Sequence, residues 1–369
     1  MMEPISLYIH IPFCGSKCAY CDFYSIKTNN DTIKNYVDEL IIKIKEYSKI
    51  YKRKLKTIYF GGGTPSYIGT TNLIKILNSI TNSFDTLQNA EITLECNPNN
   101  LNLLDFNLLR KYGFNRISIG LQSSNEKELK ILSRKHTKED VTNMINAARK
   151  SGIDNISVDV MLCIPKQTKD SLNDTIQFCI NNKVNHISGY ILKIEKNTKF
   201  YNIKDTLDLK DDDTQAEFYE LFVDELSKNG YIQYEISNFS KPSYESKHNL
   251  TYWRDEEYLG LGPSAHSFIE GKRYYFNRNF NEFYNNKLIY DTIGGDKEEF
   301  VMLSLRLNEG LIFKKFENKY HISFPKEFIN RALLLEKQNL LKITNKNIYL
   351  TTKGMLVSNK VISYLLDFI

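Results

Sequence analysis

Short apolar runs alternate with longer amphipathic stretches in the first half of the chain. Six runs rich in β-branched and aromatic residues predict strands, at 6–11, 57–60, 91–94, 116–119, 156–160 and 186–191. Apolar residues recur at helical spacing over 32–48, 73–80, 104–109, 141–148 and 171–180. This alternation predicts parallel βα units, which right-handed crossovers would curl into a full or partial TIM-like (β/α) barrel of six strands. An open doubly wound sheet is the competing α/β topology.

The alternation stops after about residue 195. A helix is expected to begin at the acidic run 211–213 and to continue to residue 228, whereas 231–280 is aromatic and irregular. The tail contains a helix, a hairpin with Asn and Lys at its turn, and a second helix, an order that resembles a winged-helix-like unit. We therefore expect a barrel core at 1–230, an aromatic connecting region at 231–295 and a smaller α+β winged-helix-like domain at 296–369.

Composition narrows the functional classes. The chain has 369 residues, 41% of them hydrophobic, and a formal net charge of +5. That charge is low for a dedicated nucleic-acid binder, so no nucleic-acid partner is expected. No apolar run is long enough for a transmembrane helix, and the first residues lack the basic region of a signal peptide. These features predict a cytoplasmic protein with reduced thiols.

Three cysteines follow the first expected strand directly. Cys14, Cys18 and Cys21 are spaced x3 and x2, and an odd number of thiols in a reducing compartment argues against disulfides. Zinc is one alternative, although structural zinc sites need four ligands, of which His10 could be the fourth. An iron–sulfur cube is the other, and with three thiolates it keeps one iron open to a further ligand.

Polar residues and glycines follow the next expected strands. The run Gly61–Thr64 lets backbone approach a ligand, and its amides can bind a carboxylate, although a plain βα turn is the simpler alternative. Glu95 ends the third strand, where barrel strands present side chains to the active-site mouth. Gln122, Arg134 and Asp159 form a second polar set. Arginine binds carboxylates well, but an internal pair between Arg134 and Asp159 carries equal weight.

The segment 248–253, HNLTYW, contains the only tryptophan. A histidine beside aromatic rings can ligate heme iron while the rings pack against the porphyrin. A hydrogen-bonded core histidine is an equally weighted interpretation of His248. His266 is a weaker second candidate for heme ligation. The histidines at 136, 186 and 321 are interpreted as structural.

The cysteine triad after a first barrel strand resembles the signature of the radical S-adenosylmethionine (SAM) superfamily. The ordered series YIHIPFC, KCAYCDFYS, IYFGGGTPS, ECNP, RISIGLQS, SVDVMLCIPKQT, YEISNF, HNLTYW and LGLGPSAHS narrows the resemblance. It is similar to the heme-chaperone branch of the oxygen-independent coproporphyrinogen III oxidase-like family over about residues 5–355.

This resemblance implies a [4Fe–4S] cluster on Cys14, Cys18 and Cys21, with SAM on its open iron. A one-electron reduction could then cleave SAM. The implied SAM contacts are Tyr8, Tyr20, Gly62, Gly63, Thr64 and Glu95, with Gln122, Arg134 and Asp159 at a second SAM molecule. The implied heme contacts are His248, Tyr252 and Trp253.

The same resemblance implies a role for the whole protein. It would bind heme as cargo and deliver it to apo-hemoproteins such as respiratory enzymes. Its further expected partners are an electron donor for the cluster and a second copy of the chain in a homodimer. Peripheral attachment to a membrane is also compatible with such a role.

Two alternatives come from other functional classes. One is a decarboxylating coproporphyrinogen III dehydrogenase, but such enzymes carry a further cysteine where this chain has Phe23, and a long extension where only five residues precede the first strand. The other is an RNA-modifying radical SAM enzyme, against which the modest charge argues. Two local departures concern Ser133 and Cys163, which stand where relatives commonly have glycine.

Overall fold

Six parallel strands form the centre of the molecule in the computed structural model, which describes residues 3–369. Neighbouring strands pair in sequence order without a reversal, which confirms the partial barrel and excludes the doubly wound alternative. The six strands are β1 (Ile5–Ile11), β2 (Leu55–Gly62), β3 (Thr86–Cys96), β4 (Arg116–Gln122), β5 (Asn155–Leu162) and β6 (His186–Ile191).

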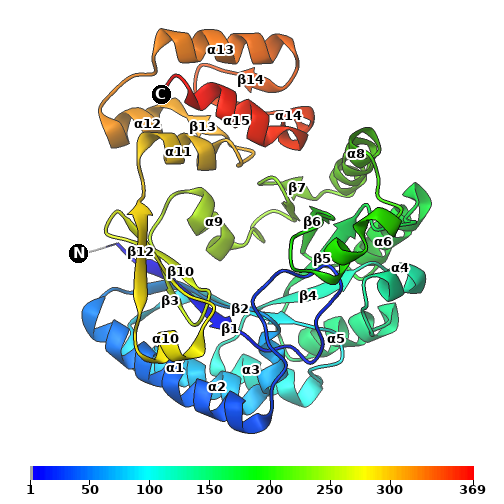
Figure 1. Cartoon of the computed structure of the whole chain (residues 1–369), viewed down its shortest axis with the longest axis vertical. Coiled ribbons are helices and arrows are strands. Elements are labelled where there is room, and N and C mark those ends of the chain that lie inside the picture. Colours follow the sequence, from blue (N-terminus) through cyan, green and yellow to red (C-terminus); the bar gives the residue numbers. More distant parts are fainter. Residues whose placement is uncertain (1–2) are drawn as a thin grey trace.

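Amphipathic helices cover the outer face of these strands (Figure 1). Three of them begin with a capping box, which explains their sharp starts. The outer helices are α1 (Asn30–Ile50), α2 (Thr70–Ser83), α3 (Leu103–Tyr112), α4 (Glu126–Ile131), α5 (Lys138–Lys150), α6 (Lys169–Asn181) and α8 (Asp212–Lys228). Short turns of helix connect them at η1 (Pro65–Ile68), α7 (Lys199–Asn202) and η2 (Lys204–Thr206).

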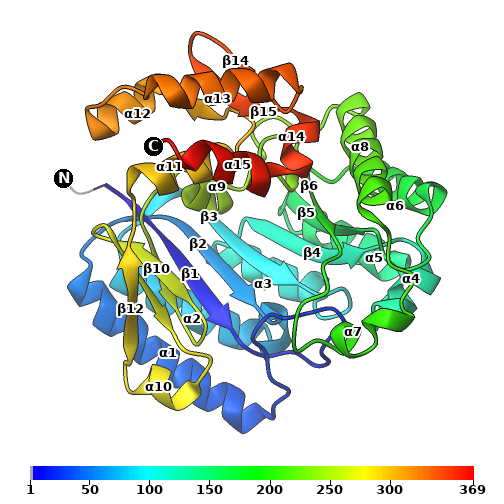
Figure 2. The same cartoon turned by 45° about the horizontal axis from the view of Figure 1, so that its top comes forward.

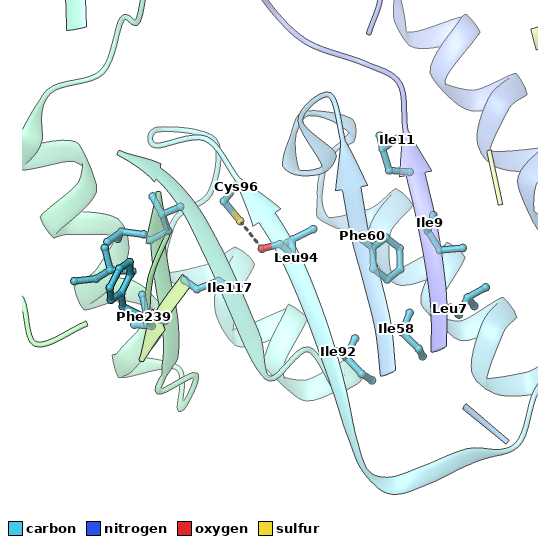
Figure 3. Packing of buried hydrophobic residues seen from close by; sticks show 14 of the residues in the cluster. Leu7, Ile9, Ile11, Ile58, Phe60, Ile92, Leu94, Cys96, Ile117 and Phe239 are labelled. Atoms are coloured by element: carbon cyan, nitrogen blue, oxygen red, sulfur yellow. Dashed lines mark hydrogen bonds between the residues drawn. The ribbon is translucent and has the colours of Figure 1, made fainter. Parts of the chain in front are cut away.

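The core lies between the sheet and these helices. Leu7 and Ile9 of β1 pack beside Ile58 and Phe60 of β2 in this layer, and all four are fully buried (Figure 3). Because side chains alternate along a strand, the residues between them face the opposite side, toward the barrel interior. The inner face of these strands therefore carries the polar residues from which a site can be built.

The aromatic region expected to be irregular is largely ordered into strands, which corrects that expectation. β9 (Tyr258–Leu261) pairs in parallel with β1, and the sheet continues antiparallel through three more strands. These are β10 (His266–Ile269), β11 (Lys272–Phe276) and β12 (Leu288–Ile293), with α10 (Phe280–Tyr284) before the last. On the other edge, β8 (Asn238–Ser240) and β7 (Ile232–Gln233) follow β6. The whole sheet has twelve strands.

The HNLTYW segment is also not a loop. It forms α9 (Lys247–Trp253), which begins with the Ser246 side chain as its cap. Glu91 of β3 accepts the amides of Lys247 and His248, both at 3.1 Å, and these bonds satisfy the exposed amides at the start of the helix. The helix is thereby fixed to the inner face of the barrel, near the amino ends of β1 to β3 (Figure 1).

The C-terminal residues form a separate winged-helix-like unit, as expected. Its three-stranded sheet has the order β13-β15-β14. The elements are α11 (Lys297–Ser304), β13 (Leu311–Ile312), α12 (Phe313–Tyr320), α13 (Lys326–Lys337), β14 (Leu341–Ile343), β15 (Asn347–Leu350), α14 (Thr352–Leu356) and α15 (Ser358–Leu366). Figures 1 and 2 show this unit beyond α9, and Lys319 of α12 pairs with buried Asp255 at 2.6 Å. Within 3–369, no helix is both long and apolar enough to span a membrane.

Candidate functional site

The three cysteines lie in the loop that connects β1 to α1, at the carboxyl end of the parallel strands. All three are unpaired thiols of intermediate exposure. The sulfur of Cys14 lies 3.2 Å from the hydroxyl oxygen of Thr64, which follows β2. Burial raises the pKa of Cys21 to about 11, and the neighbouring thiols of Cys18 and Cys14 add to the rise. These three thiols therefore influence one another electrostatically, and binding iron would release their protons.

The structure leaves a zinc site without its expected fourth ligand. His10, the expected fourth ligand, is buried and uses both ring nitrogens, toward the Tyr8 hydroxyl at 3.0 Å and the Tyr24 carbonyl at 3.1 Å. A [4Fe–4S] cube places its thiolates on different irons, so it suits a wider set of sulfurs than a single ion does.

The glycine turn after β2 is tied to the cysteine loop. The amide of Gly63 donates to the Ile11 carbonyl at 2.9 Å, and that of Thr64 donates to the Phe13 carbonyl at 2.8 Å. A Cβ on Gly63 would lie 2.7 Å from the Phe13 oxygen, so only glycine fits this approach. The turn and the cysteine loop thus form one wall, and Thr64 contacts both.

Glu95 lies at the end of β3, where the Tyr59 hydroxyl donates to its carboxylate at 2.8 Å. Burial raises the pKa of Glu95 to about 7, although hydrogen bonds from Tyr59 and from the Gly62 amide oppose the rise. A carboxyl group with this pKa can donate or accept at neutral pH. Tyr59 was not predicted as a site residue. It could have been, because it lies two residues before Gly61 and therefore on the same face of β2 as that glycine.

A hydrogen-bond network connects the residues expected to contact the first SAM molecule with those expected to contact the second. Arg134 donates to the Tyr20 hydroxyl at 2.7 Å and to the Asn97 side-chain oxygen at 2.8 Å. Asn97 in turn donates to Thr64 at 3.0 Å. Sequence reasoning missed Asn97, although it lies two residues after Glu95 in the ECNP motif.

The expected alternative of an internal pair between Arg134 and Asp159 is not formed. Among the residues described, no ion pair joins them, and Asp159 accepts from Ser118 at 3.4 Å. Burial raises the pKa of Asp159, while the charges of Arg116 and Arg134 oppose the rise. Gln122, at the end of β4, is buried with a left-handed φ of 67°. Arg134 and Asp159 therefore hydrogen-bond to other neighbours and not to each other.

His248 is buried inside the molecule with both ring nitrogens in use. Its Nδ1 lies 2.7 Å from the Thr57 hydroxyl, and its Nε2 lies 2.8 Å from the Tyr252 hydroxyl. The ring stacks on Tyr59 at a centroid distance of 4.8 Å. Burial lowers the pKa of His248 to about 3, and the charge of Arg116 adds to this effect. In this conformation, ligation of heme iron would require displacing one hydroxyl.

The other heme candidates lie apart from His248. Trp253 is directed to the C-terminal unit, where the Arg306 guanidinium lies 5.8 Å from its ring centroid. His266 is exposed on β10 and stacks on Tyr275 at 5.4 Å. The structure therefore brings Tyr252 to His248 but does not bring the three HNLTYW candidates to one point.

A pocket of about 380 Å³ adjoins the cysteine loop. Its charged lining combines three cationic and two acidic side chains, namely Lys17, Lys196 and Arg278 with Asp22 and Glu195. Lys17 and Asp22 belong to the loop itself, so this pocket opens beside the expected cluster position. Its mixed charge suits a polar ligand or a partner protein better than an apolar one.

Comparison with known proteins agrees with this geometry. Residues 8–179 match the model of the Radical SAM superfamily, and 297–357 match that of the HemN C-terminal domain. This class of protein implies a [4Fe–4S] cluster and SAM, and the three reduced thiols beside a glycine turn fit those groups.

Curated relatives define the family more narrowly. The heme chaperone HemW of Lactococcus lactis is 36% identical, over 100% of this chain and 99% of the relative. HemW of Bacillus subtilis is 34% identical, over 96% and 97%. The chain belongs to the HemW family of radical SAM proteins. The structure of coproporphyrinogen III oxidase (HemN) from Escherichia coli superposes with a TM-score of 0.85 over 100% of this chain and 91% of HemN, but at 22% identity this supports the fold alone.

Proposed function

We propose that this protein is a heme chaperone, which binds heme and delivers it to apo-hemoproteins such as respiratory enzymes. The observation that carries the proposal is the 36% identity to a curated heme chaperone over the full length of both chains. The shared length includes α9 and the C-terminal unit, so the similarity extends beyond the barrel.

Cys14, Cys18 and Cys21 would hold the [4Fe–4S] cluster. Tyr8, Tyr20, Gly62, Gly63, Thr64 and Glu95 would contact SAM, and Gln122, Arg134 and Asp159 would contact a second SAM molecule. When bound, the cluster and SAM supply one-electron chemistry or a structural element. Thr64 holds the Cys14 thiol in place, and Arg134 orients Tyr20.

Heme would bind beside α9, with His248 as the proposed iron ligand and Tyr252 and Trp253 as neighbouring aromatic groups. A hemin titration followed by absorption spectroscopy tests this assignment. His248→Ala should weaken binding and change the heme spectrum, whereas Tyr252→Phe should strengthen it because it frees Nε2. His321→Asn on the exposed surface is the matched control. Unchanged spectra for both variants would assign the ligand elsewhere, with His266 tested next.

The first alternative is a coproporphyrinogen III dehydrogenase, and Phe23 argues against it. Its side chain is 64% exposed two residues after Cys21, where the decarboxylating enzymes carry a cysteine. Reconstituted protein, given coproporphyrinogen III, SAM and a strong reductant, should form no protoporphyrinogen. Cleavage of SAM to 5′-deoxyadenosine shows that the cluster is competent in the same assay. Protoporphyrinogen at catalytic yield would establish the dehydrogenase instead.

Other partners remain proposals. An electron donor would reach the cluster from the side of the pocket beside Lys17 and Arg278. Cluster-dependent homodimerisation is tested by gel filtration with and without the cluster, and peripheral membrane attachment by sedimentation with vesicles. The match of 297–357 to the HemN C-terminal domain gives no support to the alternative of an RNA-modifying enzyme.

A further inference from the structure

Arg116 is a buried arginine without a partner. Its side chain is 2% exposed at the start of β4, and its Nε has no hydrogen-bond partner. Among residues 3–369, no ion pair or side-chain hydrogen bond involves its guanidinium. An isolated buried charge is strongly unfavourable, so proteins normally pair such groups. This arginine therefore needs an explanation that the folded chain alone does not provide.

A second unpartnered group lies beside it. Thr93 of β3 is the register partner of Arg116, is fully buried, and has a hydroxyl oxygen without a hydrogen-bond partner. Register partners in a parallel sheet point to the same face, which here is the barrel interior. Two neighbouring donors are thus directed to the barrel interior.

The other buried polar side chains in this part of the barrel interior already have hydrogen-bond partners. His248 bonds to Thr57 and Tyr252, and Glu91 accepts two amides of α9. His186 lies between Ser157 and Tyr234, at 2.7 and 2.8 Å.

Glu95 and Asp159 feel the charge of Arg116, which opposes the rise of their pKa, but neither forms an ion pair with it. One unpartnered acceptor of the chain lies in the same row, the buried side-chain oxygen of Asn155, which is the register partner of Arg116 on β5. An uncharged amide oxygen does not neutralise a guanidinium, so a charged acceptor for Arg116 would have to come from a ligand.

We propose that Arg116 and Thr93 bind a carboxylate of the ligand, and that this carboxylate is a propionate of the porphyrin. The assignment rests on the proposed heme function. A guanidinium and a hydroxyl together match the acceptor oxygens of a carboxylate. Tyr59, in the same row of the sheet, and Tyr252 would provide aromatic contact.

SAM is the other source of a carboxylate. Tyr8, one of its proposed contacts, lies in the same row of the sheet as Tyr59 and Thr93, and Glu95, another, is level with Ser118, two residues after Arg116. Position along the strands therefore does not separate the two sources, and the binding experiments below distinguish them. Helix α9 reaches the same row, because the ring of His248 stacks on Tyr59.

The test compares iron protoporphyrin IX with its dimethyl ester, in which both propionates are neutral. Wild type should bind the free acid about tenfold or more tightly than the ester, because a charged hydrogen bond is lost. Arg116→Met should abolish this preference, and Thr93→Val should reduce it. Arg110→Met, on the exposed side of α3, should leave it unchanged.

Thermal unfolding of the ligand-free variants separates a binding role from a structural one. Replacing an unpaired buried charge with an apolar side chain should keep or raise the melting temperature of Arg116→Met. A large drop in melting temperature, together with an unchanged preference for the free acid, would show a structural role and overturn the proposal.

Three further outcomes overturn it separately. Equal binding of the free acid and the ester by wild type would rule out the propionate site and leave the proposed heme function intact. If wild type binds neither porphyrin, both the propionate site and the heme function are ruled out. Loss of SAM binding in Arg116→Met, with the porphyrin preference retained, would assign the guanidinium to the methionyl carboxylate.

Discussion

Nη2 of Arg134 lies 2.7 Å from the hydroxyl oxygen of Tyr20, and this contact ties the loop after α4 to the loop that carries the three cysteines. Tyr20→Phe removes the acceptor and leaves Arg134 with Asn97 alone. We expect the free energy of unfolding to fall by about 1–2 kcal/mol and the cysteine loop to become more susceptible to protease. Denaturant unfolding measures the first effect, and Tyr112→Phe, on the exposed surface, is the control. Equal stability of the two variants would show that the contact contributes nothing.

The cluster assignment predicts a selective effect of cysteine substitutions. Cys18→Ser should lose the brown iron–sulfur absorption and most of the iron bound per chain after anaerobic reconstitution. Cys179→Ala removes a fully buried thiol from α6 and should retain the full spectrum. A Cys18→Ser variant with an unaltered spectrum would contradict the ligand set.

Buried Glu235 makes the stability of the protein depend on pH. Burial raises its pKa from 4.5 to about 7, opposed in part by hydrogen bonds from Ser237 and Asn238 and by the charge of Arg306. The folded state therefore holds more protons than the unfolded state within this interval, and its stability falls as pH rises from about 4.5 through 7.

Glu235→Gln should remove this pH dependence, which amounts to up to about 3 kcal/mol in the free energy of unfolding across the interval. The exposed substitution Glu298→Gln is the control. The shift of Glu95 has the same direction, so part of the slope should remain. Unfolding free energies at pH 5 and pH 8 measure the difference. A slope of the wild-type size in Glu235→Gln would contradict the assignment.

Ser133 and Cys163 are two of the non-glycine residues that occupy left-handed backbone. Ser133 has φ of 60° and Cys163 has φ of 62°. The strain of about 1–2 kcal/mol at such a residue exceeds the loss of backbone entropy that glycine adds. Ser133→Gly should therefore stabilise the protein by roughly 0.5–1 kcal/mol in urea unfolding. Cys163→Gly should gain less, because it removes a buried side chain, and a destabilised Ser133→Gly would contradict the strain argument.

The sequence predicted the six central strands because their apolar runs are short, regular and separated by amphipathic helices. The His186–Ile191 strand was predicted with both of its ends. The sequence did not predict β9 to β12 or α9. The parallel partner of β9 and the contacts of α9 are far away in the chain, and the aromatic residues of β10 to β12 follow no strict period. Ser6 and Thr251, for example, share a hydrogen bond at 2.8 Å across 245 residues.

The residues of the candidate site also divide into those that the sequence predicted and those that it did not. Motif spacing predicted the cysteines, Gly63 and Arg134 as candidates, because each lies just after a predicted strand or helix. It did not predict Asn97 or Arg116 as candidates, because their proposed roles depend on which neighbours lack or provide hydrogen bonds. Such pairing across strands is a property of the folded sheet and leaves no local signal in the sequence.

The parallel pairing of β1 with β9 has a consequence for the order of biosynthesis. β1 immediately precedes the cysteine loop, yet residues 258–261 complete one of its two edges. A nascent chain that has released only the parallel strands would expose β1 as an unpaired edge, which can pair with other chains. The cysteine loop therefore gains its full support late, after about seven-tenths of the chain has been made. Truncations that end before Tyr258 should aggregate, whereas those that remove only the C-terminal unit keep the edge covered.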